Sequence, residues 1–252
     1  MVEQLKVLIA GESWVTTCTH IKGFDVFVNS NYEEGVEWLK KGLEENGVAV
    51  DYLPNHVAAR KFPTTMEELR NYDVVILSDI GANTLLLHPD TFTKSIPTPN
   101  RLGLLKDYVA SGGGLCMIGG YLTFQGIEAK GAWRGTQVEE ILPVNLLPGD
   151  DRVEVPESFS PRIVGSTHPV LRGIPQKWPI FLGYNRLIPK PEAVVLAEHN
   201  EDPFIAVMQY AGGRTMAFAS DCSPHWGPPG FTGWKYYPTF WAQAVKWLAG
   251  RD

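Results

Sequence analysis

The sequence predicts an α/β fold with a doubly wound, mostly parallel sheet, helices on both faces and a β-rich C-terminal extension. Over the first 120 residues, short apolar runs alternate with amphipathic helical segments. Strand–helix–strand units of this length cross over right-handedly and make neighbouring strands parallel. From about residue 150, prolines recur and short strand-like pieces replace the helices. Because no flexible linker separates the halves, we expect one domain over 1–252, with a core at 1–150 and the extension at 151–252.

Each element of the first half has its own signal. Leu5–Ala10 is a short apolar run typical of a buried parallel strand. Apolar residues spaced three and four apart predict a helix over Glu33–Asn46, ended by Gly47. The same reasoning predicts strands at Val48–Leu53, Asp73–Ser78 and Leu115–Ile118. It predicts a short helix that starts with a capping box at Thr64–Leu69, and a longer helix at Asn100–Ser111.

Two elements stand out in the second half. Ile205–Tyr210 and Thr215–Ala219 flank Gly212-Gly213 and predict a β-hairpin. Its second strand leads directly into Ser220–Trp226, a run rich in polar and titratable side chains. Tyr237–Leu248 has one apolar face and predicts a final helix packed on the sheet.

Composition limits the classes of partner. The 252 residues carry a net charge of −6 with a pI near 5.6, which offers no electrostatic footprint for nucleic acid or an anionic membrane. No apolar run approaches the length of a membrane span, and the first residues lack the pattern of a signal peptide. Three widely spaced cysteines fit a reducing compartment. We therefore expect a cytoplasmic protein with a small-molecule ligand.

The predicted topology selects the site before any motif is considered. In doubly wound sheets, ligands bind beyond the carboxyl ends of the strands. Four segments lie there: Gly11–Trp14, Asp79–Asn83, Gly119–Tyr121 and Ser220–Trp226. Their polar side chains are the candidates for substrate contact.

Glu12 and Ser13, after the first strand, could orient a polar substrate, and Glu12 could act as a general base. In the alternative, structural interpretation, Ser13 bonds the loop backbone and Trp14 covers the edge of the sheet. Asp79, after the third strand, should face the same crevice. It could equally cap the next short helix.

Two other regions could reach the crevice. Val15–Tyr32 shows no clean periodicity and is interpreted as a long loop, a type that is usually functional or mobile in compact domains. Its His20 and Lys22 could extend over the site or over a neighbouring subunit. Tyr184 and Asn185 would reach the pocket if the extension folds back onto the core.

The run from Asp221 to Trp226 supports three interpretations. Cys222 could be a thiolate nucleophile with His225 as its base. Asp221, Cys222 and His225 could bind a metal, together with His20, although this spacing alone is a weak metal signal. The run could also be a structural loop with Trp226 packed. We expect no metal and no cofactor, since the glycine-rich runs also lack the nucleotide-binding motifs.

Several segments together resemble a known family. They are Gly11–Trp14, Lys22–Asp25, Ser78–Gly81, Gly112–Tyr121, Gly149–Glu154 and Ser220–Gly227. Spread over nearly the whole chain, they resemble the class I glutamine amidotransferase-like superfamily, which has a flavodoxin-like fold. More narrowly, they resemble its glutamine amidotransferase-like family related to the trehalose-utilisation proteins. The resemblance implies the fold but does not assign a reaction.

The chain departs from a working glutaminase of that superfamily in its nucleophile. There, a cysteine sits on a glycine-flanked turn between a strand and a helix, beside backbone N–H donors. Here that turn falls at Gly119–Tyr121, which has no cysteine. Cys116 lies inside the preceding strand, where core packing is the favoured role and a nucleophile the alternative. The usual His-x-Glu pair is also missing, because Gly227 follows two residues after His225. Ordinary glutamine hydrolysis is therefore not expected.

Two functional hypotheses remain. In the first, the protein is a hydrolase or transferase of a small amide-, ester- or sugar-related substrate, with Cys222 as nucleophile, His225 as acid/base and Glu12 as auxiliary carboxylate. The turn would donate to an oxyanion. Substrate contacts would come from Ser13, Trp14, His20, Lys22, Asp79, Gly119, Gly120, Tyr121, Tyr184, Asn185, Asp221 and Trp226.

In the second hypothesis, the protein is a catalytically silent binding or assembly module. Its eight tryptophans and nine tyrosines would then stack on a carbohydrate-like ligand or form homo-oligomer contacts. The two hypotheses differ in one feature, because only an enzyme needs a titrating group with a perturbed pKa in the crevice.

Overall fold

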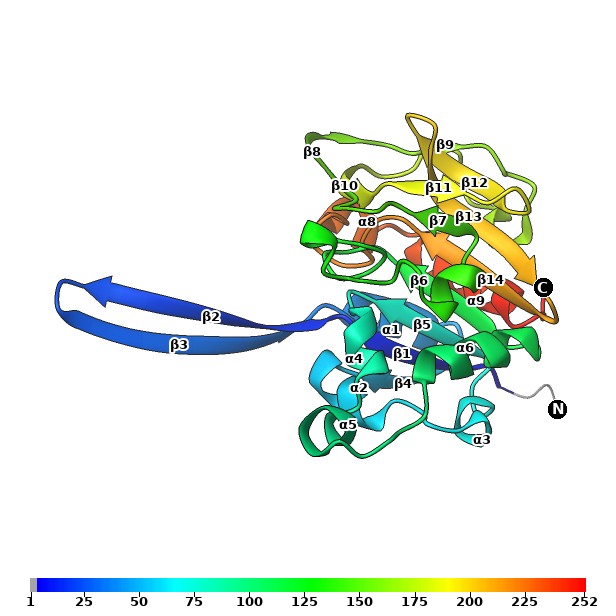
Figure 1. Ribbon diagram of the computed structural model, residues 1–252. Helices are drawn as coiled ribbons and strands as arrows, with labels where there is room; N and C mark the ends of the chain where they lie inside the picture. Colours follow the sequence, from blue (N-terminus) through cyan, green and yellow to red (C-terminus); the bar gives the residue numbers. More distant parts are fainter. Residues whose placement is uncertain (1–3) are drawn as a thin grey trace.

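An eight-stranded sheet runs through the computed structural model, which describes residues 4–252 (Figure 1). Its strand order is β4-β1-β5-β6-β14-β13-β12-β9, and the first five of these are mutually parallel. The strands are β1 (Lys6–Gly11), β4 (Ala49–Leu53), β5 (Val74–Ser78), β6 (Gly114–Ile118), β9 (Arg162–Ile163), β12 (Val194–His199), β13 (Asp202–Tyr210) and β14 (Gly213–Phe218). The predicted fold class is confirmed. The prediction about the start of the chain rests in part on residues 1–3, which lie outside the described residues.

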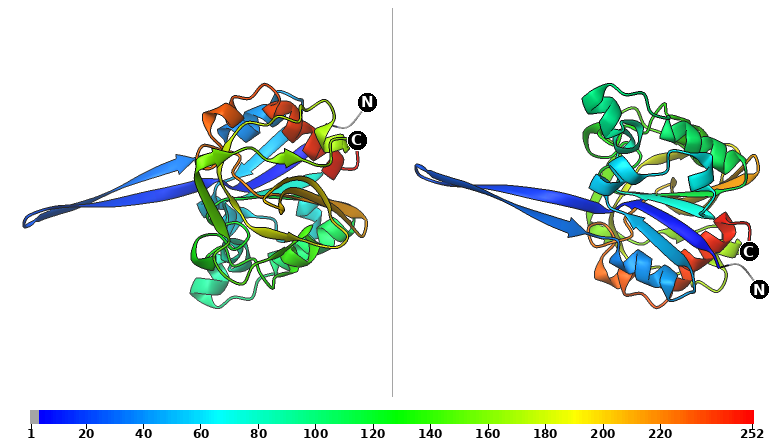
Figure 2. Two further views of the ribbon diagram at one scale, coloured as in Figure 1. Left: turned by 90° about the horizontal axis from the view of Figure 1, so that it is seen from above. Right: turned by 90° about the horizontal axis from the view of Figure 1, so that it is seen from below.

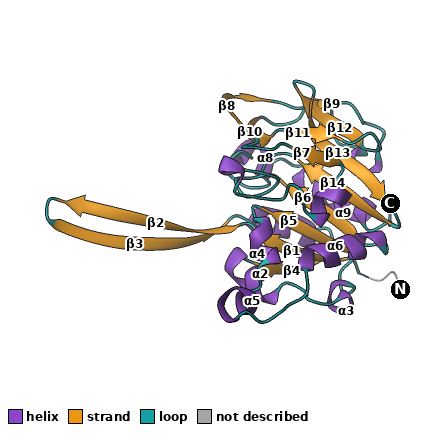
Figure 3. Ribbon diagram, in the orientation of Figure 1, coloured by secondary structure: helices purple, strands orange, loops and turns teal. Residues whose placement is uncertain are grey.

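Helices cover both faces of this sheet (Figures 2 and 3). One face carries α1 and α9, and the other carries α2, α4 and α6 (Figure 2). The helices are α1 (Glu37–Glu44), α2 (Asn55–Lys61), α3 (Met66–Leu69), α4 (Ala82–Leu86), α5 (Pro89–Lys94), α6 (Arg101–Ala110), α7 (Gln137–Ile141), α8 (Pro229–Thr232) and α9 (Tyr237–Leu248), with 3₁₀ turns at Ile127–Ala129 and Pro169–Leu171.

The central strands are apolar along their whole length because both of their faces are covered. Every residue of β5 and β6 is buried. Helix starts follow the sequence signals: Thr65 and Glu68 form the predicted capping box of α3, and the Asn100 side chain caps α6. This rigid layer fixes where the strand ends lie.

The extension contributes to the same sheet and adds two small ones. β7 (Val144–Leu146) pairs with β11 (Leu187–Pro189), and β8 (Arg152–Phe159) pairs with β10 (Phe181–Asn185). Phe181 packs against Phe204 and Phe231, with ring centroids 4.8 and 4.6 Å apart. Through this aromatic packing, β10 returns to the core, and its last residue reaches the turn after β6.

The largest difference from expectation lies in residues 13–34. Instead of a loop, they form a long antiparallel hairpin of β2 (Ser13–Lys22) and β3 (Asp25–Glu34), in register from Ser13–Glu34 to Lys22–Asp25. The hairpin extends away from the body in all three views (Figures 1 and 2). The alternation was missed because threonine and serine interrupt the apolar residues on one face, which weakens the period-2 signal.

No helix among residues 4–252 combines the length and the apolar character needed to cross a membrane.

Candidate functional site

A cavity of about 520 Å³ opens at the carboxyl edge of the sheet. Each of the four segments predicted for this edge contributes at least one residue to its walls. Its walls are Glu12, Trp14, Asp79, Tyr121, Leu122, Ile127, Asp221, Ser223, Pro224 and His225. The topological prediction of the site is therefore matched by a real cavity with titratable walls.

Two acidic residues begin this edge in an unusual backbone conformation. Glu12 follows β1 with φ 48°, and Asp79 follows β5 with φ 41°. Residues other than glycine seldom adopt this region, and such strain concentrates at functional sites. The Glu12 N–H donates to the Ser78 carbonyl at 2.7 Å, so the two strand ends are held together as they turn.

Glu12 is a buried carboxyl group saturated by hydroxyl donors. Ser78 Oγ lies 2.5 Å from Glu12 Oε2, and Ser223 Oγ lies 2.8 Å from Oε1. Burial raises the pKa of Glu12 well above its ordinary value, and the charges of Asp221 and Asp79 raise it further. Burial thus favours the uncharged form of Glu12, and the two hydroxyl donors partly oppose this effect.

Asp79 is poised to titrate near neutrality. Burial, with a contribution from the charge of Asp221, raises the pKa of Asp79 to about 6. Its Oδ1 accepts the Leu122 N–H at 2.8 Å, and this donor partly opposes the rise. A carboxyl group with this pKa can exchange a proton with a substrate at physiological pH.

His225 lies across the pocket and is paired with Asp221. Its Nδ1 is 3.4 Å from Asp221 Oδ2, which lies on a side chain only 5% exposed. Burial alone would lower the pKa of His225, but the hydrogen bond and charge of Asp221 outweigh burial and raise it. The imidazole stacks on Trp226 at 5.1 Å and meets the Tyr121 ring edge-on at 4.5 Å. A carboxylate that holds one ring nitrogen also sets the tautomer presented to the pocket.

Cys222 is placed differently from the prediction. Its side chain is fully buried, is not part of the pocket wall, and has its Sγ 3.6 Å from Ser78 Oγ and 3.7 Å from Glu12 Oε2. Burial raises the pKa of the thiol well above its ordinary value, and Glu12 and Asp221 raise it further. Because a nucleophilic cysteine needs an accessible thiolate, the geometry does not support the predicted role of Cys222. Cys116 is buried inside β6, as core packing requires, and burial raises its pKa as well.

Among the described residues, Glu12, Asp221 and Cys222 are the group that could hold a metal ion, with ligand atoms within 4.8 Å of one another. Two of the three are groups whose protonated form is favoured, whereas metal binding requires deprotonated ligands. His20 does not join them, because it lies in the outer half of the hairpin. The metal interpretation of the sequence is therefore corrected in two ligands, because neither His20 nor His225 belongs to this group.

The turn after β6 does not offer the oxyanion donors that the sequence suggested. The Gly119 N–H donates to the Phe218 carbonyl at 2.8 Å, and the Gly120 N–H donates to Asn185 Oδ1 at 3.0 Å. The next N–H groups, of Tyr121 and Leu122, donate to Asp79. The anion bound at this turn is thus the protein's own Asp79 carboxylate.

Gly120 stands at the elbow where a glutaminase carries its cysteine. Its φ is +152°, and a Cβ built there would lie 2.8 Å from Asp79 Oδ1 and 3.2 Å from Asp79 Cβ. Asp79 therefore occupies the space that an elbow side chain would need.

Replacing Gly120 by Cys is expected to lower the free energy of unfolding by about 2 kcal/mol without creating glutaminase activity, because the new side chain must displace Asp79. Gly47→Cys is the matched control, since Gly47 also has a positive φ but has open space around it. Urea unfolding and ammonia release from glutamine measure the two effects. Glutamine hydrolysis by the Gly120 variant would show instead that the elbow is intact.

Ser13 and Trp14 have different roles. Ser13 is buried, and its Oγ accepts the Asn55 N–H at 2.8 Å, as in the structural interpretation. Trp14 lines the pocket at the root of the hairpin, and its Nε1 donates to Glu33 at 2.7 Å. Tyr121 also lines the pocket, and its hydroxyl donates to Glu154 at 3.0 Å.

The remaining predicted contacts lie behind the pocket or far from it. Asn185 bonds both the N–H and the carbonyl of Gly120, so it positions the turn. Trp226 is buried beneath His225. Three contacts are corrected: Tyr184 is a core residue whose hydroxyl bonds Asp202, and His20 and Lys22 lie on the hairpin, away from the cavity.

Sequence reasoning missed several residues that build the site. Ser78 and Ser223 are the donors to Glu12, and both follow or end a strand that points to this edge. Asp151, which lies in the acidic run Asp150-Asp151, is buried and accepts the N–H groups of Gln125 and Gly126, both at 2.8 Å. Leu122, Ile127 and Pro224 complete the wall and carry no chemical signal in the sequence.

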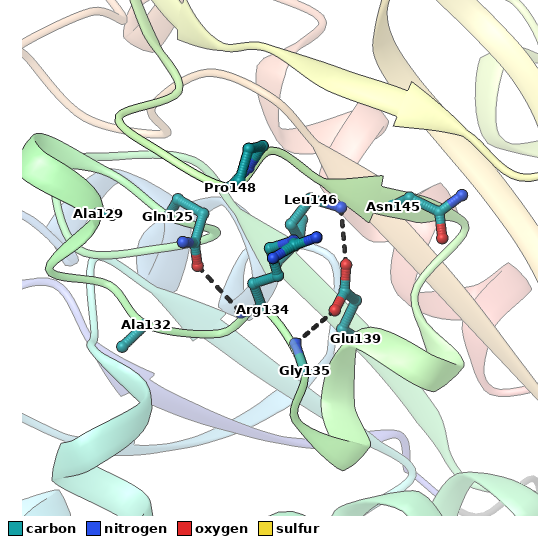
Figure 4. A pocket seen from close by; sticks show the side chains of 9 residues that line it. All are labelled: Gln125, Ala129, Ala132, Arg134, Gly135, Glu139, Asn145, Leu146 and Pro148. Atoms are coloured by element: carbon teal, nitrogen blue, oxygen red, sulfur yellow. Dashed lines mark hydrogen bonds between the residues drawn. The ribbon is translucent and has the colours of Figure 1, made fainter.

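A second, larger cavity of about 690 Å³ is lined by residues between Gln125 and Pro148 (Figure 4). Two of its polar side chains bond the backbone: Gln125 accepts the Arg134 N–H, and Glu139 accepts the N–H groups of Gly135 and Leu146. Its acidic and basic lining residues are Glu139 and Arg134, whereas the smaller cavity gathers three carboxyl groups and a histidine. The groups suited to acid–base chemistry are therefore concentrated in the smaller cavity.

Comparisons with known proteins agree with this fold. A family model described as "Putative glutamine amidotransferase" matches residues 6–250. The solved structures of the cytoplasmic proteins STM3548 and STM1381 from Salmonella typhimurium are each 46% identical, with 97% of this chain and 99% of theirs covered and TM-scores of 0.94 and 0.93. A ThuA-like protein from Parabacteroides merdae is 12% identical over 98% of this chain and 90% of its own, with a TM-score of 0.60, which shows a shared fold. Among curated proteins, none matches the chain significantly.

Proposed function

The chain belongs to the glutamine amidotransferase-like family, and from this premise we propose that it is a hydrolase or transferase of a small polar substrate that uses carboxylates and a histidine instead of a cysteine. One observation carries the proposal. Asp79, the Asp221–His225 pair and Glu12, whose pKa burial raises, converge on a single cavity at the carboxyl edge of the sheet. Titratable groups with opposed environments in one pocket are the mark of acid–base chemistry.

The geometry supports a division of roles. With its pKa near 6, Asp79 can accept a proton from an attacking water, while His225, whose pKa Asp221 raises, can give a proton to the leaving oxygen or nitrogen. The water oxygen forms a bond to the acyl or acetal carbon as the leaving-group bond breaks; the water loses one proton to Asp79, and the leaving group gains one from His225. Burial favours the uncharged form of Glu12, which limits the negative charge in this small site.

The walls favour a neutral substrate with a flat or ring-shaped face. The acidic side chains of Asp79 and Asp221 disfavour anions, whereas Trp14 and Tyr121 offer aromatic surface. A volume of about 520 Å³ suits a small molecule. A sugar-related amide, ester or glycoside fits these properties.

The net charge of −6 supports our further proposals that no nucleic acid or anionic membrane is a partner. We also propose a cytoplasmic location, because the two Salmonella proteins that are 46% identical to this chain are named cytoplasmic proteins.

Asp79→Asn and His225→Gln are each expected to lower turnover about 100-fold, because each removes one proton-transfer group. The measurement is hydrolysis of a panel of neutral nitrophenyl glycosides, esters and anilides by the purified protein. Glu67→Gln, an exposed carboxylate on α3, is the matched control and should leave the rate unchanged. Turnover that both site variants retain would refute the assignment.

A second candidate is a catalytically silent binding module, and Gly120 at the elbow favours it, since the usual nucleophile is missing. Titration calorimetry with neutral sugars separates the two candidates. The binding module would be supported if a sugar binds saturably, no panel substrate is turned over, and the Asp79→Asn variant binds the sugar as tightly as wild type.

A further inference from the structure

The β2–β3 hairpin, which we call the arm (residues 13–34), is a two-stranded sheet that stands alone. Among residues 4–252, no third strand pairs with either of its edges. All residues of β3 and all of β2 after Ser13 are exposed. A two-stranded hairpin without a partner layer is marginally stable in water, so an arm of ten residue pairs requires an explanation.

The two faces of the arm differ in chemistry. Side chains alternate between the faces, so cross-strand partners share a face. The apolar arm face consists of the pairs Val15–Tyr32, Thr17–Ser30, Thr19–Val28 and Ile21–Val26. The opposite face carries polar groups such as His20 and Asn29, which are hydrogen-bonded to each other at 2.9 Å.

Large hydrophobic side chains of the apolar arm face lie in solvent. Val15, Ile21, Val26 and Val28 are 62, 72, 59 and 59% exposed, and Tyr32 is 46% exposed. Together they expose an area on the order of 500 Å², which is as large as the largest apolar patch of a typical monomer, a kind of patch that is often functional. Phe24 at the tip is also exposed, whereas Trp14 and Phe27 lie on the opposite face of the arm.

We propose that the apolar arm face is an assembly surface whose partner is the arm of a second copy of this chain. Two such faces stack as a small sandwich, with sheets about 10 Å apart. A twofold axis then buries the same residues on both copies. The root pair Val15–Tyr32 and the outer pair Ile21–Val26 are both apolar, so arms lying antiparallel match along their whole length.

Charge supports a second copy over a membrane. Near the tip, Lys22 and Asp25 are cross-strand partners of opposite sign, and Glu33 and Glu34 at the root are acidic. The four pairs of the apolar arm face carry no charge, and the charged residue next to them on that face, Glu34 at the root, is acidic. An anionic lipid surface would therefore find nothing to attract it, whereas the four pairs of an identical face can dock without desolvating a charge.

Assembly also bears on the pocket, because the arm begins at its wall. Trp14 lines the cavity and is tied to Glu33 across the two strands of the root. A second copy that orders the arm would therefore hold this wall in place.

Val28→Asp and Asn29→Asp test the proposal as a matched pair, since they place the same charge at adjacent positions on opposite faces. The measurement is the mass of the particle by light scattering and sedimentation from about 1 to about 100 µM. Wild type and Asn29→Asp should form a particle of twice the 28.0 kDa chain mass. Val28→Asp should weaken self-association at least about tenfold, because it buries a charge in the contact.

Three outcomes would overturn the proposal. They are a wild-type monomer throughout the concentration range, equal effects of the two variants, or a dimer that survives replacement of residues 16–31 by a short turn. Flotation of monomeric wild type with anionic phospholipid vesicles would assign the face to a membrane instead. Thermal unfolding of each variant serves as the folding control, and because the arm lies outside the body, the body's transition should stay unchanged.

Discussion

Replacing Asp79 by Asn is expected to raise the free energy of unfolding at pH 8 and to leave it unchanged at pH 4. The pKa of Asp79 is about 6 in the folded protein, against an ordinary value of 3.8. Between these values the folded state holds a proton that the unfolded state has released, so wild type loses stability as the pH rises. Two pKa units correspond to roughly 3 kcal/mol, and screening at the partly exposed carboxylate reduces the expected gain to about 2 kcal/mol.

Urea unfolding at the two pH values measures this difference. Asn keeps the Oδ1 that accepts the Leu122 N–H, so the substitution removes the charge and preserves that hydrogen bond. Asp150→Asn is the control of opposite sign, because Arg152 lowers the pKa of Asp150 and neutralising it should cost a little stability at pH 8. If the Asp79→Asn variant is less stable than wild type at pH 8, the charged carboxylate stabilises the folded protein, and the expectation is wrong.

Alkylation should separate the three cysteines by at least about 1,000-fold. Cys18 is exposed on the arm, whereas Cys116 and Cys222 are buried. A buried thiol reacts only after the structure opens, and an opening that costs more than about 4 kcal/mol slows the reaction by that factor. Burial also raises the pKa of both buried thiols, which lowers the thiolate fraction that reacts.

Iodoacetamide labelling of the native protein, read by mass spectrometry at each cysteine from pH 6 to pH 9, checks this order. Labelling in denaturant is the control, and all three thiols should react there at similar rates. Rapid labelling of Cys222 in the native protein below its ordinary pKa would restore the covalent mechanism that its burial opposes.

In the mechanism that we propose, the turn after β6 allows a carboxylate to act where a glutaminase uses a thiol. The N–H groups of Tyr121 and Leu122, which follow Gly120, are directed at the Asp79 carboxylate. They stabilise its ionised form and thus keep its pKa near neutrality in spite of burial and the nearby Asp221. The backbone of the turn therefore serves to tune an acid instead of stabilising an oxyanion.

Local sequence patterns were sufficient for the layered fold and for the location of the site. The apolar run of β5 predicts a strand that is buried on both faces. The capping box of α3 predicts a helix start because it satisfies the free N–H groups there, and the apolar face of α9 predicts a helix that is buried on one side. Parallel topology then places Glu12, Asp79 and Asp221 at one edge. These predictions depend only on neighbours in the chain and on general rules of connection.

The tertiary structure decided what these residues can do. The arm was missed because its apolar face packs on no core of its own chain, so the sequence lacks the strong alternation that a core imposes. Burial of Cys222, the serine donors to Glu12 and the N–H groups that hold Asp79 all join residues more than 40 positions apart. A pKa depends on solvent exclusion and on charges that converge in space, and these are set by the folded chain as a whole.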